Sequence, residues 1–245
     1  MSNEHRTAIV TGASKGIGAA IAKRLAADGF RTVVNYAASA TEAQAVVAAI
    51  EKGGGRATAI GGDVSQASAM KTLFDRAESE FGPVDVLVNN AGIFRLSLLA
   101  EVSDEDYQRQ IAVNLTGTFN GMREGAKRVR DGGRIINLST SVIGNYFPAY
   151  GVYAATKAAV EAMTHVLAKE LGARGVTVNA VAPGPVATEL FLTGRSEEFI
   201  QRMAKDIPLG RLGEPDDIAR VVAFLASPES GWINGQVVKA NGGRN

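Results

Sequence analysis

A strand–turn–helix unit near the start of the chain constrains its fold more than any other stretch. The apolar run 8–10 predicts a short buried strand, and apolar residues recur every four positions from Ile17 to Leu25, as on one face of a helix. Between them lies Thr11-Gly12-Ala13-Ser14-Lys15-Gly16-Ile17-Gly18. Glycines permit unusual backbone angles and close approach of a ligand, and the free N–H groups that begin a helix suit a phosphate. The unit predicts a dinucleotide pyrophosphate site, with a ligand-free glycine turn as the alternative.

Strands and helices are expected to alternate along the whole chain. Helical periodicity marks 19–28, 43–50, 70–77, a stretch that Ser103 caps and that runs toward Leu115, 153–171 and 216–225. This alternation predicts an α/β fold with a doubly wound, mostly parallel sheet covered by helices on both faces. No linker or repeat divides residues 1–245, so we expect a single domain. The seven expected strands are 8–10, 31–36, 56–60, 84–89, 134–138, 176–181 and 236–240.

Composition excludes several classes of protein. The chain has 245 residues, a net charge of +1 and no cysteine, which argues against nucleic-acid binding, disulfides and thiol chemistry. His5 lies in a polar tail and His165 in the middle of a predicted helix, so no metal site is expected. Residues 1–6 lack an apolar targeting core, and no apolar run has the length that crosses a membrane. We therefore expect a soluble, cytoplasmic protein.

The end of the second strand indicates which nicotinamide cofactor fits. An acidic residue there would bind the adenosine ribose hydroxyls and repel a 2′-phosphate. This chain has Asn35-Tyr36-Ala37-Ala38-Ser39, without an acid, and Lys15 supplies a positive charge in the glycine turn. Asn35 and Ser39, with the backbone N–H groups of 37–39, are candidate donors to the phosphate. These features predict NADP(H), with a solvated surface role as the alternative for Lys15.

Two further strand ends carry short polar segments. Asp63-Val64 follows the third strand, and Asn89-Asn90-Ala91-Gly92 closes the fourth. Ordinary turn chemistry accounts for each of them separately, because asparagine and glycine are common in turns. Their recurrence at successive carboxyl ends of strands, where α/β sheets bind ligands, favours a cofactor site.

The expected reaction chemistry lies between Asn137 and Lys157. Tyr153 and Lys157 are four residues apart and share one face of a helix. An ammonium near a phenol lowers the phenol's pKa, so that the tyrosine can exchange a proton near neutral pH. Upstream, Ser139-Thr140-Ser141 ends the fifth strand with three hydroxyls, one of which can hydrogen-bond a carbonyl oxygen.

Together these motifs resemble short-chain dehydrogenase/reductases of the classical type, from about Thr7 to Gly243. The matching segments are the glycine motif 11–18, Asn89 to Gly92, the tyrosine–lysine motif 153–157, Asn114 within 113–117, and Pro183-Gly184 with Thr188 following. Within the family the chain is most similar to NADPH-dependent 3-oxoacyl carrier-protein reductases and trihydroxynaphthalene-type reductases.

The resemblance implies a Rossmann fold of about seven strands with hydride transfer at the strand tips. It implies that Tyr153 donates the proton, that Lys157 holds the nicotinamide ribose, that Asn114 positions a water, and that a serine binds the carbonyl oxygen. The expected cofactor-binding residues are Gly12, Ser14, Lys15, Gly16, Ile17, Gly18, Asn35, Tyr36, Ser39, Asp63, Val64, Asn90, Ala91, Gly92, Tyr153, Lys157, Pro183, Gly184, Val186 and Thr188.

The carbonyl-binding hydroxyl has three candidates. The family spacings from Asn137 and from Tyr153 both fall on Thr140. The segment Ser141-Val142-Ile143-Gly144 nevertheless reads like the family's Ser-Val-x-Gly, which begins with the catalytic serine. We therefore expect Ser141, then Thr140, then Ser139.

The expected substrate pocket combines 93–96, 144–150 and a lid at about 188–207. Phe94, Tyr146, Phe147, Tyr150 and Phe191 fall in these loops, which favours an apolar or aromatic ketone, with packing under the lid as the alternative. The main alternatives for function are a non-catalytic NADPH sensor or scaffold and an alcohol or polyol dehydrogenase that works in the oxidative direction.

Two expectations concern partners of the chain. The C-terminal segment and the helices around Leu115 and Leu167 resemble the family's subunit contacts, which implies a homotetramer. Arg128, Arg130 and Arg174 are candidates for a basic patch that binds an acyl carrier protein, although scattered arginines are usually solvated.

Overall fold

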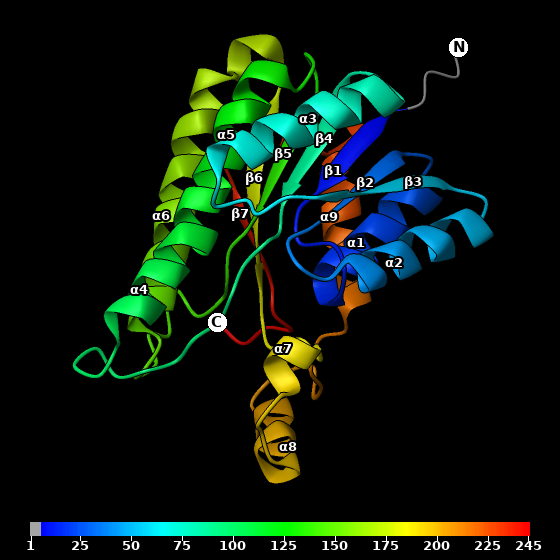
Figure 1. Cartoon of the computed structure of the whole chain (residues 1–245). Coiled ribbons are helices and arrows are strands. Elements are labelled where there is room, and N and C mark those ends of the chain that lie inside the picture. The colour runs from blue at the N-terminus through cyan, green and yellow to red at the C-terminus, as the bar shows by residue number, and fades with distance from the viewer. Residues whose placement is uncertain (1–5) are drawn as a thin grey trace.

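One seven-stranded parallel sheet organises the chain, in a computed structural model that describes residues 6–245. The strand order is β3-β2-β1-β4-β5-β6-β7, and all six neighbouring pairs are parallel (Figure 1). The order reverses direction between β1 and β4, and such a switch point is where open α/β sheets bind ligands. The strands are β1 (Thr7–Val10), β2 (Arg31–Tyr36), β3 (Arg56–Gly61), β4 (Val84–Asn89), β5 (Arg134–Leu138), β6 (Thr177–Pro183) and β7 (Val237–Ala240).

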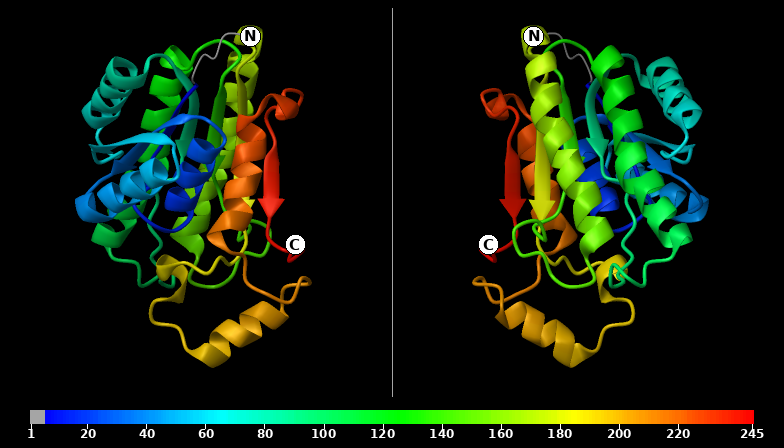
Figure 2. Two further views of the ribbon diagram at one scale, coloured as in Figure 1. Left: turned by 90° about the vertical axis from the view of Figure 1, so that its right-hand side faces the viewer. Right: turned by 90° about the vertical axis from the view of Figure 1, so that its left-hand side faces the viewer.

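Helices cover both faces of the sheet, as Figure 2 shows from two sides. One face carries α1 (Gly16–Ala27), α2 (Ala40–Lys52) and α9 (Pro215–Ala226), and the other carries α3 (Ala67–Phe81), α5 (Gly117–Arg128) and α6 (Gly151–Glu170). Both layers bury their apolar stripes against the sheet, which itself is buried on both sides. The predicted fold class, an α/β doubly wound Rossmann-type sheet, is therefore confirmed.

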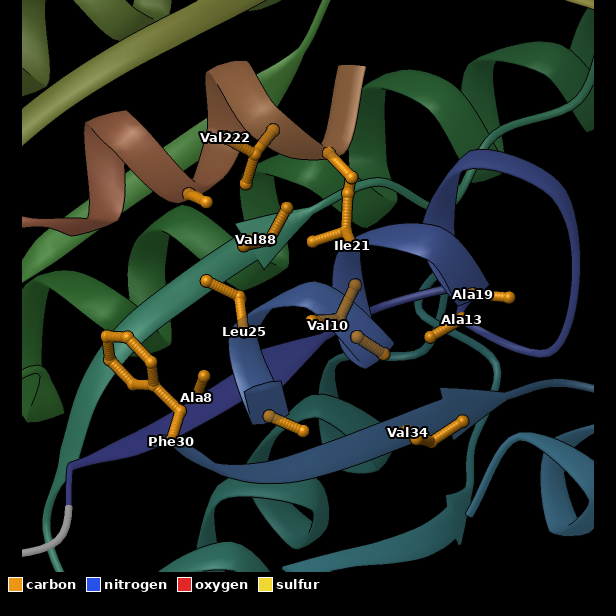
Figure 3. Close-up of a cluster of buried hydrophobic side chains, with 14 of the residues drawn as sticks. Ala8, Val10, Ala13, Ala19, Ile21, Leu25, Phe30, Val34, Val88 and Val222 are labelled. Atoms are coloured by element: carbon orange, nitrogen blue, oxygen red, sulfur yellow. The ribbon is translucent and has the colours of Figure 1, made fainter. Parts of the chain in front are cut away.

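The first helix shows how the periodicity predicted from sequence builds the core. Ile21 and Leu25 are fully buried and lie over Val10 of β1, with Val222 of α9 packed beside them (Figure 3). Burial of such a side chain stabilises the fold by roughly 1.5–3 kcal/mol relative to leaving it exposed. The packing of α1 against α9 fixes the start of α1 above the tip of β1, where the glycine turn lies.

One helical stretch extends further than the sequence indicates. Ser103 caps α4 (Asp104–Gln110) as expected, because its Oγ accepts a hydrogen bond from the Asp106 N–H at 3.1 Å. The chain then passes through a π-helical turn (Ile111–Thr116) directly into α5, a continuation that the sequence analysis did not identify. Two short helices, α7 (Glu189–Leu192) and α8 (Glu197–Lys205), project beyond the carboxyl ends of the strands (Figure 1).

The remaining short elements are the 3-10 turns Gly172–Arg174 and Pro228–Ser230. Among residues 6–245, no helix combines the length and the apolar character that a membrane span requires.

A buried chain of polar side chains joins the middle of the sheet to α6. The Asn89 amide donates to Asn137 Oδ1 at 2.8 Å, and the Asn137 amide donates to Thr164 Oγ1 at 3.0 Å. Gly121 lets α5 lie directly on Asn89, since a Cβ on Gly121 would stand 2.0 Å from Asn89 Oδ1. The position therefore requires glycine for space rather than for backbone conformation.

We predict that Gly121→Ala lowers the free energy of unfolding by about 2 kcal/mol, a cost typical of overpacking. Asn89 is 4% exposed and held by Asn137, so it cannot move aside cheaply. Gly172→Ala is the matched control, because a Cβ there meets nothing within 4 Å, and we expect its effect to stay within about 0.5 kcal/mol. Urea unfolding at one protein concentration measures both, and equal midpoints would contradict the packing argument.

Candidate active site

A cavity of about 680 Å³ opens at the carboxyl ends of the strands. Its volume lies in the range of cofactor and small-molecule sites. All twenty residues that the sequence predicted for the cofactor line it, as do Ser139, Thr140 and Ser141. Asn114, the remaining predicted catalytic residue, lies behind the wall of the cavity and is fully buried.

The glycine turn has the shape that a bound pyrophosphate needs. Gly12 and Gly16 have φ of 60° and 57°, a conformation that side chains other than glycine rarely adopt. At Gly18 a Cβ would stand 2.4 Å from Asn90 Nδ2 and 2.4 Å from the Gly12 carbonyl oxygen, so no side chain fits there. No acidic residue occupies the first turn of α1, which leaves the positive end of the helix dipole free for an anion.

Asn90 and Thr11 tie the glycine turn to the end of β4. The Asn90 amide donates to the carbonyl oxygens of Thr11 and Gly12 at 2.9 and 3.0 Å. Thr11 Oγ1 accepts from the backbone N–H groups of Asn90 and Ala91 at 3.0 and 3.1 Å. The Asn90 side chain therefore shapes the cofactor crevice, and its amide hydrogens are already used by the chain.

The role predicted for Asn35 as a phosphate donor is wrong. Its amide donates to the carbonyl oxygens of Ile60 and Gly62 at 3.2 and 3.1 Å, and its Oδ1 accepts from the Gly12 N–H at 3.3 Å. The Asn35 side chain is 1% exposed and supports the glycine turn from its buried side. The remaining candidate donors on this side are the 37–39 segment and Lys15, all of which line the cavity.

Lys15 forms an ion pair that crosses the mouth of the cavity. Its Nζ lies 2.9 Å from Glu189 Oε2 at the start of α7, and both side chains are more than half exposed. Thr188, just before Glu189, caps α7 by accepting from the Phe191 N–H at 3.3 Å. The lysine predicted to read a phosphate is thus in contact with the segment predicted to be the lid.

Asp63 is held in place at the end of β3. Its Oδ1 accepts from the Ser65 N–H at 3.0 Å, and Arg109 Nη1 lies 3.5 Å from its Oδ2. Partial burial raises the pKa of this carboxyl, but the hydrogen bonds from Ser65 and the Arg109 guanidinium outweigh burial, so the pKa is lowered overall. The group is a fixed carboxylate acceptor at neutral pH.

Tyr153 has the opposite pKa shift from the one predicted. The pKa of its phenol is raised to about 12 overall: burial is the largest cause, the Thr140 side chain opposes it, and the neighbouring Tyr150 adds to it. The Phe94 ring packs edge-on against the Tyr153 ring, with centroids 4.9 Å apart. In this structure the phenol is neutral and protonated at neutral pH.

Lys157 lies one helical turn after Tyr153 and is only 4% exposed. Its Nζ donates to the Leu138 carbonyl oxygen at 2.7 Å, at the tip of β5. Burial lowers the pKa of the ammonium to about 8. A nearby charge can therefore change whether Lys157 is protonated near neutral pH. A Cβ on Gly92 would stand 3.6 Å from this nitrogen, which sets the lysine beside the turn after β4.

The three hydroxyls after β5 differ in their partners. Ser139 Oγ donates to Glu161 Oε1 at 2.6 Å and is therefore engaged with α6. The Thr140 side chain interacts with the Tyr153 phenol and lowers its pKa, and its Oγ1 accepts from the Val142 N–H at 3.3 Å. Ser141 is fixed through its backbone, since its N–H donates to the Pro183 carbonyl oxygen at 2.9 Å and its own carbonyl oxygen accepts from Asn245 Nδ2 at 2.8 Å.

Asn114 lies in the π-helical turn and grips the segment after Gly92. Its Oδ1 accepts from the Ile93 N–H at 2.8 Å, and its Nδ2 donates to the Ile93 carbonyl oxygen at 2.9 Å. A single π-helical turn inside an α-helix is often found at a functional site. Here Asn114 Oδ1 lies 3.4 Å from the position that a Cβ on Gly92 would occupy, so the buried Asn114 amide is next to the turn after β4.

Aromatic side chains line the end of the cavity next to Tyr153. Phe94 packs against both Tyr150 and Tyr153, and Phe147 packs against Tyr150. Tyr146 is a correction to the sequence analysis: it is 67% exposed, has a φ of 48° and lies outside the lining. The cavity is also lined by four residues that no sequence motif marks: Arg109, Phe199, Met203 and Arg244.

The arginines considered for a basic patch lie in ion pairs. Arg128 contacts Asp75 and Glu78 at 2.8 and 2.6 Å, and Arg174 contacts Asp131 at 2.7 Å. Arg130 contacts Asp85 at 3.1 Å, and its backbone N–H donates to Val84, the first residue of β4. Arg130 thus lies at the opposite end of the sheet from the cavity, and the paired arginines offer no support for a carrier-protein patch.

His165 lies away from the cavity lining: its Nδ1 is 2.7 Å from the Gly235 carbonyl oxygen, on the exposed side of α6. His5 lies outside the described residues.

Comparisons with known proteins agree with this geometry. A family model described as enoyl-(acyl carrier protein) reductase matches residues 12–245. The chain is 48% identical to the NADPH-dependent aldehyde reductase 2 of Arabidopsis thaliana, covering 97% of this chain and 93% of that protein. It is 43% identical to the 3-oxoacyl-[acyl-carrier-protein] reductase FabG of Staphylococcus aureus, over 97% of each. A Burkholderia cenocepacia short-chain dehydrogenase solved in complex with NADP superposes with a TM-score of 0.93 at 39% identity, over 100% of both chains.

We predict that Lys157→Met stabilises the fold at pH 7 while it abolishes activity. The lysine's pKa falls from 10.5 to about 8 on folding, so the charged form is disfavoured in the folded protein. Between pH 8 and 10.5 the unfolded chain binds more protons, and wild-type stability rises with pH there. We expect a gain of about 1 kcal/mol or more at pH 7 that disappears toward pH 10.5.

Thermal unfolding of both proteins across this pH range measures the difference. The exposed Lys169 on the same helix provides the control Lys169→Met, for which we expect no such trend. A Lys157→Met protein that is less stable than wild type at pH 7 would show that the Leu138 hydrogen bond outweighs the cost of burial.

Proposed function

Because the chain belongs to the short-chain dehydrogenase/reductase family, we propose that it is an NADP(H)-dependent oxidoreductase that reduces a ketone to a secondary alcohol. The observation that carries the proposal is the meeting of Tyr153, Thr140 and Lys157 at the wall of the cavity that also contains the glycine turn. Reduction of an aldehyde by the same groups is the coarser form of this activity, supported by the Arabidopsis relative's name.

The residues present fit NADP(H). The glycine turn leaves no room for side chains, and the segment after β2 offers exposed alanines where an acidic residue would repel a 2′-phosphate. Lys15 supplies the positive charge beside it. The NADPH-dependent and NADP-bound relatives support the same choice. When bound, NADPH supplies the hydride, and the protein supplies position, a proton and an environment for the developing negative charge.

The proton comes from Tyr153 in this proposal. A phenol that burial keeps protonated at neutral pH is a donor ready for reduction, whereas oxidation of an alcohol requires the phenolate. Lys157 holds the nicotinamide ribose and, when charged, stabilises the phenolate that the proton leaves behind. Asn114 positions a water on the path by which the proton is replaced, a role supported only by the family resemblance.

Thr140 is our proposed carbonyl-binding hydroxyl, ahead of the Ser141 that the loop sequence favours. The hydroxyl and the phenol must reach the same carbonyl oxygen, and of the three hydroxyls Thr140 is the one that lowers the pKa of the Tyr153 phenol through its side chain. The family spacing from Asn137 and from Tyr153 supports the same residue. Ser139 is the least suitable, because its hydroxyl donates to Glu161.

A homotetramer and a cytoplasmic location also remain proposals from the sequence. Exposed apolar side chains on the outer faces of α5 and α6, Phe119 and Val166, support subunit contacts through these helices, and Trp232 near β7 is 99% exposed. These are the helices that the family resemblance assigns to subunit pairing.

We predict that Tyr153→Phe lowers kcat/KM for a ketone by about a thousandfold or more, while the dissociation constant of NADPH changes less than threefold. The substitution removes the proton donor and little volume. Tyr150→Phe, which removes a hydroxyl from the same cavity, serves as the control, and we expect less than a tenfold change. Near-normal turnover by Tyr153→Phe would contradict the role of Tyr153 as proton donor. If the wild-type protein binds NADPH but reduces no ketone, a sensor function would be favoured instead.

The choice between hydroxyls has its own test. We expect Thr140→Val to reduce kcat by about a hundredfold, as for a lost oxyanion donor, and Ser141→Ala by less than tenfold. Steady-state rates with one accepted ketone measure both. The reverse order of the two losses would assign the role to Ser141.

We predict that Lys15→Ala raises the dissociation constant of NADPH about tenfold and that of NADH less than twofold, because only NADPH carries the 2′-phosphate. Ala37→Asp should shift the preference toward NADH by repulsion and by new ribose contacts. Lys23→Ala, an exposed lysine further along α1, controls for net charge. Equal losses for both cofactors in Lys15→Ala would refute Lys15 as the phosphate reader.

A further inference from the structure

Two arginines near the aromatic end of the cavity have no carboxylate partner in the described part of the chain: Arg244 lines the cavity, and Arg195 stands against the rings that line it. Arg195, between α7 and α8, lies over three rings, with its Cζ 5.8 Å from the Phe94 centroid, 3.9 Å from Phe191 and 5.2 Å from Phe199. Arg244 lies over Phe147 at 5.4 Å and lines the cavity. Within the described residues neither guanidinium forms an ion pair.

Each guanidinium has hydrogen-bonding capacity that the protein leaves unused. Arg195 Nη1 is buried and has no hydrogen-bond acceptor among residues 6–245. The side-chain contact of Arg244 Nη1 is the Met203 thioether, 2.6 Å away, which is a weak, neutral acceptor. A buried N–H without an acceptor is costly, and it gains most from an anionic one.

The nearby acidic side chains are occupied elsewhere. Glu189 pairs with Lys15, Glu197 accepts from Gln201 at 3.4 Å, and the Glu198 carboxyl has its pKa lowered by its own backbone N–H and by the Ser196 side chain. Both arginines instead contact one face of α8, because Phe199 under Arg195 and Met203 beside Arg244 are four residues apart. The two cations therefore stand over consecutive turns of the same helix, on the side that faces the cavity.

We propose that Arg244 in the cavity lining, together with Arg195 behind the aromatic rings of that lining, forms an anion subsite that selects ketones bearing a carboxylate. The inference rests on the proposed function and names its substrate class: an aromatic or apolar body with a carbonyl at one end and a carboxylate at the other. Phe94 sets the spacing, since its ring contacts the Tyr153 ring and also lies beneath Arg195. In the reaction the carbonyl carbon gains hydride, its oxygen gains the Tyr153 proton, and the carboxylate is unchanged.

The subsite is tested by binding and by turnover with matched pairs of ketones. The probes are 3- and 4-acetylbenzoate with their neutral amides, and 4-oxopentanoate and 6-oxoheptanoate with theirs. Calorimetry with the NADP-loaded enzyme gives dissociation constants, and NADPH consumption gives kcat/KM. We expect at least one carboxylate to exceed its amide about tenfold in both measurements, the size of one charge-assisted hydrogen bond.

Variants locate the effect. R195M and R244M should each remove most of the preference for the carboxylate while they change kcat/KM for the amide less than threefold, which shows that the lid still folds. R244K should restore part of the preference. R202M removes an exposed positive charge from α8 and should change nothing.

The outcomes separate the two proposals. Carboxylates that bind no better than their amides at any length, or variants that lose both equally, overturn the subsite even if the ketones are reduced. Tight, arginine-dependent carboxylate binding without NADPH consumption supports the subsite and overturns the proposed reductase function.

Discussion

The close approach of the turn after β1 to the turn after β4 is the constraint on which the site depends. The Asn90 amide donates to two carbonyl oxygens of the glycine turn, the Thr11 hydroxyl oxygen accepts from two backbone N–H groups after β4, and Gly18 leaves no room for a side chain between the turns. These contacts join adjacent strands at the point where the strand order reverses. Because the turns are held together by the chain itself, the crevice exists before any ligand enters, and binding need not supply the energy to form it.

The fold could be predicted from sequence because its signals are local. Each strand is a short apolar run and each long helix has a clear period, so only the ends shift by a few residues and only the continuation through α5 and the short lid helices were not identified. The lining of the cofactor cavity was predictable for the same reason, since glycine and amide motifs follow the strand tips. The hydrogen-bond partners of side chains could not be predicted in this way. From the sequence Asn35 is a free donor, but in the fold its amide donates to one carbonyl oxygen in β3 and to another just after it. Arg244 lines the cavity although no motif marks that part of the chain.

The pKa values of Tyr153 and Lys157 show why closeness in the sequence does not by itself predict the charge states of two side chains. Tyr153 and Lys157 share a helix face, which suggests that the ammonium lowers the phenol's pKa. Lys157 is buried and Tyr153 is half-buried, however, and desolvation disfavours the charged form of each, raising the tyrosine pKa to about 12 and lowering the lysine pKa to about 8. The pair is therefore poised with a neutral donor beside a cation that is easily neutralised. A charged Lys157, one helical turn away, would stabilise the negative charge that develops on the phenol when Tyr153 gives up its proton.

The segment 188–207 makes a contact at each end of the cavity, and each contact involves a positively charged side chain. At one end Glu189 holds Lys15, and at the other Arg195 rests on Phe94, which packs against Tyr153. An exposed ion pair contributes little free energy, so a 2′-phosphate can replace Glu189 at Lys15 at small cost. Released from Lys15, the start of α7 is restrained by the Thr188 cap and by the arginine over the aromatic rings. In our proposals the 2′-phosphate binds at Lys15 and the substrate carboxylate binds beside Arg195, so both ligands would act on the same short segment, and each would change the contacts available to the other.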